Sequence, residues 1–311
     1  MLIPFSRFRS VLSPVDFISI VFLFVLTALN LIFAARVSQW LVIALVNLIA
    51  VGGIFWLART AEEKKTRLMI GLHRWYCYPI ILFVFKEIYL MVHPIHPIDY
   101  DAWFISVDRW MFGVNPTQWV AQFAHPALTE LFQLAYFSYY LLFIIMGVEI
   151  YRRFPIEDFD HAAFLVVYGF YLSYIGYFAL PGVGPRFTLH DFYAMNTELP
   201  GLWFTEPIRN FVNGAESIPV GVPNPQDFVQ RDVFPSGHTQ LSLITVFLGF
   251  RFLLNSRWIL TALASLLIVG TVYLRYHYVV DLLGGVLFFL VTIWTGDKIR
   301  EWWSNRSTVG V

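Results

Sequence analysis

The stretch RDVFPSGHTQLSLITVFLGF, residues 231–250, joins a polar segment to an apolar one. Its first half carries charge, a proline, a glycine and a histidine, whereas its second half is apolar enough to lie in lipid. A membrane helix can begin with any polar cap, so PSGH at 235–238 is by itself compatible with a plain helix start. Whether this entrance also carries chemistry depends on the rest of the chain.

The composition indicates a helical membrane protein. Of 311 residues, 58% are hydrophobic and 14% are charged, whereas about a quarter of a soluble domain is charged. The formal net charge of zero gives no reason to expect a nucleic-acid partner, and the single cysteine, Cys77, cannot form an internal disulfide. We expect an all-α polytopic protein with about eight transmembrane helices. The apolar runs lie at 16–35, 40–58, 75–92, 128–149, 161–180, 238–254, 258–275 and 277–296.

These runs divide the chain into four parts. Residues 1–92 are predicted to form N-terminal transmembrane helices. Residues 93–127 mix Trp and Phe with Asp, Arg and Pro, as in short helices that lie in a membrane interface. Residues 128–300 are predicted to form a catalytic transmembrane domain that includes the long extracytoplasmic loop 181–237, and residues 301–311 a cytoplasmic tail.

The distribution of Lys and Arg predicts the orientation. With the N-terminus in the cytoplasm, fourteen of these residues lie on the inner side, including Arg7, Arg9 and Arg306, and six on the outer side. Because cytoplasmic loops are enriched in Lys and Arg, both termini are expected in the cytoplasm and PSGH on the extracytoplasmic side. The size and the lack of sorting signals favour a bacterial inner membrane.

A second histidine returns to the same side of the membrane. The sequence LRYHYVVDLLGG, residues 274–285, follows PSGH by one hairpin of two membrane helices, which brings His277 to the depth of His238. Asp281 stands four residues after His277 and shares its face on a helix. A carboxylate so placed can hold an imidazole in one tautomer. A structural polar contact is the alternative, but ionisable residues in membrane helices are rare and usually functional.

The combination is suited to phosphoryl transfer. A neutral, braced His277 can attack phosphorus, and His238 can protonate the departing alkoxide. Ser236 and Gly237 begin a helix whose free N–H groups and dipole favour a phosphate anion. Arginines can bind further phosphate oxygens in a bidentate manner. The sequence shows no carboxylate cluster typical of a metal site, so we expect no metal and no other cofactor.

These residues resemble the type 2 phosphatidic acid phosphatase (PAP2) superfamily over roughly residues 160–296. PSGH matches its second motif, and the resemblance implies a catalytic bundle of six helices. It further implies that His238 is the acid, that His277 becomes a phosphohistidine and that Asp281 supports it. Arg186, in LPGVGPRF at 180–187, is the candidate phosphate ligand of the first motif.

The chain departs from the family pattern at two phosphate ligands. No Lys stands seven residues before Arg186, and Thr271 occupies the position of the arginine expected six residues before the nucleophile. Arg275 could serve instead if the helix breaks near Tyr276. Arg231 could also serve, or it could pair with its neighbour in the chain. Further candidates for contact with the substrate are Asp232 and His190.

With these departures, the sequence resembles the inositol phosphorylceramide synthase group. It also resembles sphingomyelin synthases, in which an Asp stands six residues before the first histidine, as Asp232 does before His238. Such enzymes transfer a phosphorylated head group from a glycerolipid to a lipid alcohol, which is the function we expect, with a membrane lipid as substrate. A phosphatase that acts on phosphatidic acid or an isoprenoid phosphate or diphosphate, with water as acceptor, is the alternative. A lipid transporter is a further alternative, although PSGH and the lack of visible repeats argue against it.

Overall fold

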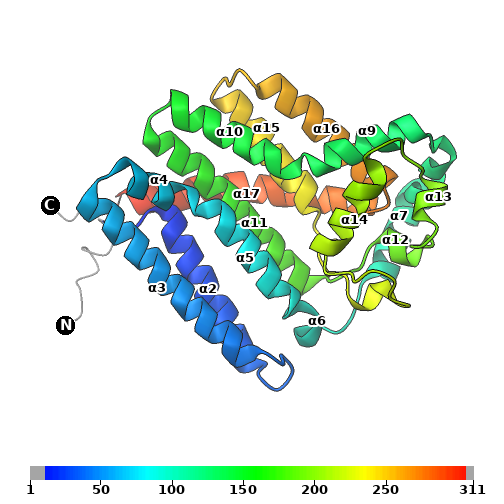
Figure 1. Ribbon diagram of the computed structural model, residues 1–311, viewed down its shortest axis with the longest axis horizontal. Helices are drawn as coiled ribbons and strands as arrows, with labels where there is room; N and C mark the ends of the chain where they lie inside the picture. The colour runs from blue at the N-terminus through cyan, green and yellow to red at the C-terminus, as the bar shows by residue number, and fades with distance from the viewer. Residues whose placement is uncertain (1–10, 306–311) are drawn as a thin grey trace.

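The computed structural model describes residues 11–305, and all regular secondary structure in this range is helical (Figure 1). Residues 1–10 and 306–311 lie outside the described residues, and with them Arg7, Arg9 and Arg306 of the orientation argument. The predicted tail 301–311 also lies partly outside, and its first residues continue the last helix to Asn305.

From residue 11 onwards, the N-terminal part consists of four helices, and their order follows from local sequence signals. They are α2 (Pro14–Ile32), α3 (Trp40–Lys64), α4 (Arg67–Trp75) and α5 (Cys77–Tyr89). A capping box starts α2, because Ser13 and Asp16 each accept a backbone N–H of the other. Lys65 ends α3 in the left-handed conformation. Asp16 also accepts hydrogen bonds from Tyr76 at 2.6 Å and contacts His73 at 2.9 Å, which ties α2 to the α4–α5 corner.

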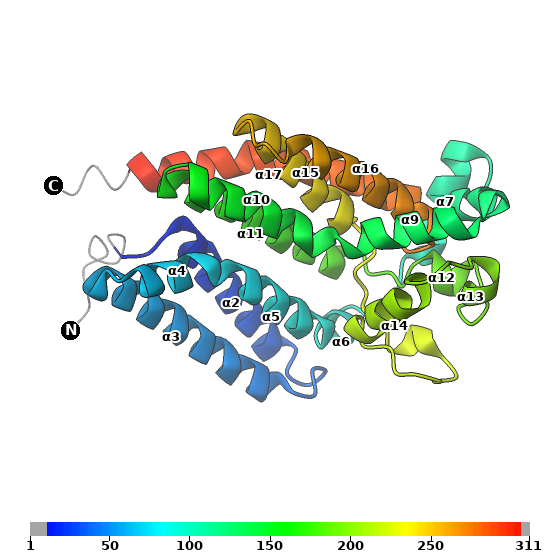
Figure 2. The ribbon, with the colours of Figure 1, turned by 45° about the horizontal axis from the view of Figure 1, so that its top comes forward.

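The remaining long helices form one bundle around α11. They are α9 (Pro126–Phe137), α10 (Tyr139–Arg153), α11 (Ile156–Ala179), α15 (Gly237–Arg251), α16 (Arg257–Tyr273) and α17 (Val279–Asn305). Helix α11 packs against α2, α5, α10, α15 and α17, so it joins the N-terminal part to the rest (Figures 1 and 2).

The predicted number of eight spans is not confirmed, although each predicted run coincides with helix. Within residues 11–305, five segments are long and apolar enough to cross a membrane, as expected of an integral membrane protein: α2, α3, α4–α5 together, α11 and α17. A sixth arises if α9 and α10, which meet at 49°, form one broken span. Helices α15 and α16 have 15 and 17 residues. They are therefore shorter than the about 20 residues that a bilayer core of about 30 Å requires.

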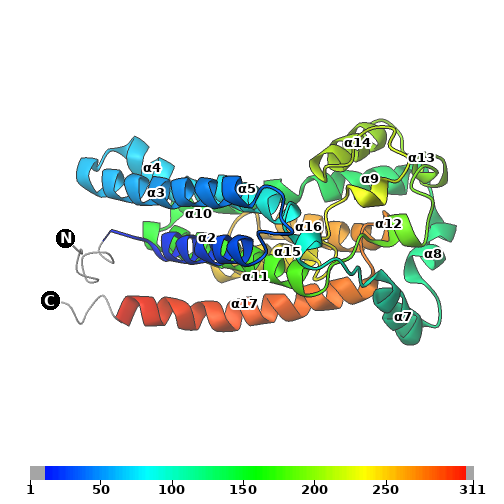
Figure 3. The same cartoon turned by 90° about the horizontal axis from the view of Figure 1, so that it is seen from below.

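Short helices gather at one end of the bundle, which we call the loop end (Figure 3). They are α6 (Val92–Ile95), α7 (Asp101–Phe112), α8 (Pro116–Val120), η1 (Ala121–Phe123), α12 (Pro185–Thr188), α13 (Met195–Glu198), α14 (Thr205–Ala215) and η2 (Pro225–Asp227). The start of α2 and the end of α17 lie at the opposite end (Figure 3). Helix α7 exposes Trp103, Trp110 and Phe112. That exposure suits an interfacial helix, and the membrane position of 93–127 stays a prediction.

Glycines let the PSGH segment lie directly on α17. A side chain at Gly285 would place its Cβ 2.7 Å from the Ser236 carbonyl oxygen, and one at Gly284 would meet the Phe234 ring at 2.6 Å. Helices within a membrane associate through close packing of small residues rather than through the hydrophobic effect. The backbone N–H of Ser236 also donates to the Asp281 carbonyl at 2.9 Å. The starts of α15 and α17 are therefore held together.

Candidate active site

The loop end brings the two histidines of the sequence prediction into direct contact. Nδ1 of His238 lies 3.3 Å from Nε2 of His277, and the ring centroids are 5.4 Å apart. His238 is the second residue of α15, whose N-cap Ser236 accepts the N–H of Thr239 at 3.2 Å. The N–H groups of Gly237 and His238 belong to the first helical turn, where no intrahelical acceptor exists. They remain available to an anion.

The surroundings of His277 determine which ring nitrogen carries the proton. Its Nδ1 lies 3.0 Å from the Val233 carbonyl oxygen, which can only accept, so Nδ1 carries the hydrogen. Its Nε2 then presents a lone pair to His238. Oδ2 of Asp281 lies 3.4 Å from the same Nδ1 and accepts the Tyr278 N–H at 2.7 Å. Asp281 thus stands beside the imidazole, while the carbonyl of Val233 makes the shorter contact.

A break in the chain between α16 and α17 presents His277. Helix α16 ends at Tyr273, and Arg275 adopts the left-handed conformation with φ of 68°. The backbone N–H groups of Tyr276 and His277 both donate to the Thr271 carbonyl, at 2.9 and 3.2 Å. The turn therefore closes on Thr271, the position at which the family pattern has an arginine.

Two tyrosine rings contact the His238 imidazole. Tyr136 stacks on its imidazole at 4.6 Å between centroids, and Tyr139 lies at 4.4 Å. Tyr136 also stacks on Tyr276 at 4.4 Å. A Cβ on Gly237 would lie 2.6 Å from the Tyr177 hydroxyl, so this glycine makes room for a tyrosine of α11. The His238 side chain itself is half-buried, whereas His277 is buried.

Arg186 lies at the site in an ion pair. Its guanidinium contacts the carboxylate of Glu216 and donates to the Asn213 amide oxygen at 3.1 Å. It also stacks over Phe187 and Tyr276, with 4.7 and 4.9 Å from Cζ to the ring centroids. A buried guanidinium of this kind is suited to a phosphate oxygen, and here a carboxylate of the same chain occupies it.

Two other predicted phosphate ligands, Arg275 and Arg231, pair with carboxylates of the chain. Although the helix does break before Tyr276, Arg275 turns to α13 and pairs with Glu198. Arg231 pairs with Asp99 at 3.4 Å rather than with its neighbour in the chain.

The two remaining candidates for contact with the substrate, His190 and Asp232, lie in different surroundings. His190 contacts the Thr117 hydroxyl at 3.0 Å, on the side of α8, and burial lowers its pKa to about 4. Asp232 lies within electrostatic range of Glu216, Arg186 and Lys86. Burial, together with the Glu216 carboxylate, raises the pKa of Asp232 to about 8. Asp232 therefore belongs to the surroundings of Arg186, and it is mainly protonated at neutral pH.

Two carboxylates of α7 hold the polar segments of the site in place. Asp108 accepts the backbone N–H groups of Val279 and Val280, both at 2.9 Å, and so caps α17. Asp101 accepts the N–H groups of Val183 and Gly184 at 3.0 and 2.8 Å.

Asp101 also accepts the Tyr278 hydroxyl at 2.8 Å, so it joins the loop before Arg186 to the residue after His277. Among residues 11–305, no group of three or more His, Cys, Asp or Glu has the arrangement of a metal site.

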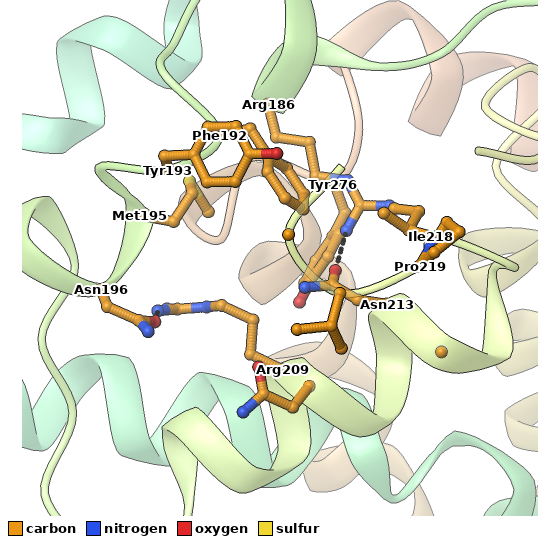
Figure 4. A pocket seen from close by; sticks show the side chains of 14 residues that line it. Arg186, Phe192, Tyr193, Met195, Asn196, Arg209, Asn213, Ile218, Pro219 and Tyr276 are labelled. Carbon is orange, nitrogen blue, oxygen red and sulfur yellow. Dashed lines mark hydrogen bonds between the residues drawn. The ribbon is translucent and has the colours of Figure 1, made fainter. Parts of the chain in front are cut away.

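A pocket of about 220 Å³ opens beside Tyr276, and we call it the Tyr276 pocket (Figure 4). Its lining includes Arg186, Phe192, Asn196, Arg209, Asn213 and Tyr276. Arg209 and Asn213 come from α14, which Glu130 of α9 holds in place. The Glu130 carboxylate accepts the N–H groups of Leu202, Trp203, Phe204 and Thr205 and the Thr205 hydroxyl. No motif in the sequence includes Arg209, and only the packing of α14 against α9 brings it to the site.

Comparison with known proteins agrees with this geometry. A protein of Dictyostelium discoideum named PA-phosphatase related-family protein is 26% identical over 176 residues, which are 51% of this chain and 30% of that protein. The chain thus spans less than a third of that relative's length. No solved structure matches. A family model described as the PAP2 superfamily matches residues 102–295, from α7 to α17 and including both histidines. The chain belongs to the PAP2 superfamily.

Proposed function

We propose that this membrane protein is a lipid phosphotransferase, which moves a phosphorylated head group from a phospholipid to a lipid alcohol through a phosphohistidine at His277. The observation that carries the proposal is the direction of the His277 ring. Its Nδ1 donates to the Val233 carbonyl, and its Nε2 faces Nδ1 of His238 at 3.3 Å. A nucleophile and a proton carrier are thus adjacent, with the reactive lone pair directed between them.

In the first half-reaction, the contact between the two imidazoles opens, and the substrate phosphorus takes the position between the two rings. Nε2 of His277 attacks phosphorus, and the bond to the glycerolipid oxygen breaks. His238 in its protonated form gives its proton to that oxygen, so a neutral diacylglycerol leaves. Free N–H groups at the start of α15 and the guanidinium of Arg186 stabilise the phosphoryl oxygens.

In the second half-reaction, the now neutral His238 removes the proton from the acceptor hydroxyl. The acceptor oxygen attacks phosphorus, the N–P bond breaks, and both histidines return to their first state. The Val233 carbonyl holds the Nδ1 proton of His277 throughout. Asp281, 3.4 Å away, stabilises the positive charge that develops on the ring when the N–P bond forms.

The charges around the histidines support a phosphodiester substrate. Arg186 is paired with Glu216, and Arg275 is paired with Glu198. A phosphomonoester with two negative charges would meet few unpaired cations there, whereas a diester carries one charge. The chain also lacks two phosphate ligands of the family pattern, in which it resembles the inositol phosphorylceramide synthase group. Fewer phosphate ligands agree with a substrate of lower charge.

The enclosure of the site supports a lipid acceptor over water. His277 is buried, and Tyr136 and Tyr139 cover His238 on two sides. Exclusion of water protects a reactive phosphohistidine from hydrolysis. The excess of Lys and Arg in the segments assigned to the inner side supports a site on the extracytoplasmic face of the membrane.

The test is incubation of the purified protein in lipid with head-group-labelled phospholipids, with and without ceramide or diacylglycerol as acceptor. His277→Ala serves as the blank. We expect the label to appear in a new lipid only when an acceptor is present. Release of soluble phosphate or phosphorylated head group without an acceptor would identify a hydrolase instead. Turnover that persists in His277→Ala would refute the phosphohistidine.

A further inference from the structure

Three buried arginines approach Tyr276, and they differ in how their charge is balanced. Arg186 contacts the carboxylate of Glu216, and Arg275 contacts the carboxylate of Glu198. Arg209 has no carboxylate partner among residues 11–305. Its two terminal nitrogens donate to neutral oxygens, the amide of Asn196 and the Leu199 carbonyl. Arg209 therefore keeps its full positive charge inside the protein.

This arrangement indicates a ligand. The Arg209 residue is 5% exposed, and neither its buried Nε nor the Tyr276 hydroxyl makes a hydrogen bond of good geometry within the described chain, although the two side chains interact with each other. A buried charge without a counter-ion costs free energy unless a ligand compensates it. Both residues line the Tyr276 pocket, so the ligand that compensates Arg209 would enter there. Figure 4 shows the Arg209 side chain extending towards Asn196 among the residues that line this pocket.

The lining of the pocket restricts the chemistry of that ligand. A guanidinium only donates hydrogen bonds, so the atoms that face it must be acceptors such as hydroxyl or phosphoryl oxygens. The amides of Asn210 and Asn213 can both donate and accept, which suits hydroxyl groups. Both lie in the last turns of α14, where the helix dipole disfavours a group with several negative charges. An ammonium group would instead add a second cation beside Arg209.

The pocket also lies in the right place for a head group. Tyr276 forms part of its wall and directly precedes His277 in the chain. Arg186, the candidate ligand of the reacting phosphate, lines the same pocket. A phosphate at the histidine pair would thus extend its polar substituent into the Tyr276 pocket, at the loop end and away from the long helices.

We infer that the Tyr276 pocket binds the head group of the phospholipid substrate, that Arg209 is its charged hydrogen-bond donor, and that the site selects hydroxyl-bearing head groups without positive charge. This inference rests on the proposed function, because it assigns the pocket to the same substrate. The place of Arg209 on α14 lies outside the motifs of the sequence.

A binding experiment tests the inference without relying on turnover. His277→Ala protein in detergent is titrated calorimetrically with dihexanoyl phosphatidylglycerol and with dihexanoyl phosphatidylcholine. We expect phosphatidylglycerol to bind at least tenfold more tightly. Adding Arg209→Gln should reduce its affinity to that of phosphatidylcholine, while Arg209→Lys should retain part of the preference because the charge remains. Arg36→Gln, an exposed arginine on the α2–α3 connection, is the matched control and should leave the ratio unchanged.

The outcomes separate this inference from the proposed function. Equal binding of the two lipids, or a preference that survives Arg209→Gln, would overturn the head-group assignment. An equal loss of both lipids in Arg209→Gln would show that the residue only supports the fold, and would overturn it as well. The proposed function fails by a different result, namely turnover of labelled lipid that does not depend on His277. A lipid preference that requires Arg209 would stand even then.

Discussion

Replacement of Asp108 by alanine should lower catalytic activity, although Asp108 contacts neither histidine. The Asp108 carboxylate accepts two backbone N–H groups at 2.9 Å, from Val279 and Val280, at the positive end of α17. A hydrogen bond to a charged group contributes about 1.5–3 kcal/mol, and loss of a helix cap costs about 0.5–2 kcal/mol. Because the two bonds share one carboxylate at one helix end, we expect a combined loss of about 2–4 kcal/mol.

The loss should appear in catalysis more than in substrate affinity. Residues 278–280 follow His277 directly, so a loosened start of α17 misplaces the nucleophile while the Tyr276 pocket remains. If about 2.7 kcal/mol of that loss is expressed in the barrier, kcat falls about 100-fold. The assay is head-group transfer at varied lipid concentration, together with thermal unfolding in detergent.

Two variants make this prediction specific. Asp108→Asn keeps one acceptor oxygen but no charge, so its kcat should lie between those of the wild type and Asp108→Ala. Asp227→Ala removes an exposed carboxylate from η2 and should change neither kcat nor the unfolding temperature. The reasoning is refuted if Asp108→Ala transfers head groups at the wild-type rate, or if only KM changes.

Three further predictions concern the surroundings of the histidine pair. Gly285→Ala should lower activity and thermal stability, because its Cβ would lie 2.7 Å from the Ser236 carbonyl; unchanged unfolding and turnover would contradict this. Glu216→Gln should lower KM several-fold by freeing Arg186 for phosphate, and a higher KM would show that the carboxylate positions the arginine. The pKa of Asp232 is raised to about 8, so its carboxyl is neutral below that pH and gains a negative charge above it. KM should therefore rise above about pH 8 in the wild type but not in Asp232→Asn, and identical pH profiles would exclude this role.

The sequence predicted the helices well because their signal is local. Apolar runs and caps such as Ser13 and Ser236 act within one or two turns, and all eight runs coincide with helix. The number of spans was harder to predict. Hydropathy alone does not indicate that α15 and α16 are short and that α9 and α10 meet at 49°.

The meeting of His238 and His277 was also accessible from sequence. A single helical hairpin separates the two residues, and two antiparallel helices of similar length must return to the same depth. The distance of 3.3 Å between their ring nitrogens agrees with that reasoning. Asp281 lies beside His277 for a similar reason, since four residues correspond to about one helical turn.

The sequence could not predict which distant carboxylates the arginines contact. Arg275 pairs with Glu198 and Arg231 with Asp99, each far away in the chain. Such pairings depend on how the loops fold over the end of the bundle. The sequence did not predict a role for Arg209, because this residue belongs to no motif and its neighbours in the chain resemble those of an ordinary surface helix.

By itself, the sequence determined that this protein is a helical membrane protein with two histidines and a carboxylate at one end of a hairpin. These properties follow from hydropathy, helical period and spacing, which act over a few turns. Only the tertiary structure decided which cations stay free, which carboxylates hold the catalytic turn, and where a head group can enter. Those properties depend on the contacts of α7 with α17 and of α14 with α9, which are pairs of helices more than 50 residues apart in the chain and meet only when the bundle has formed.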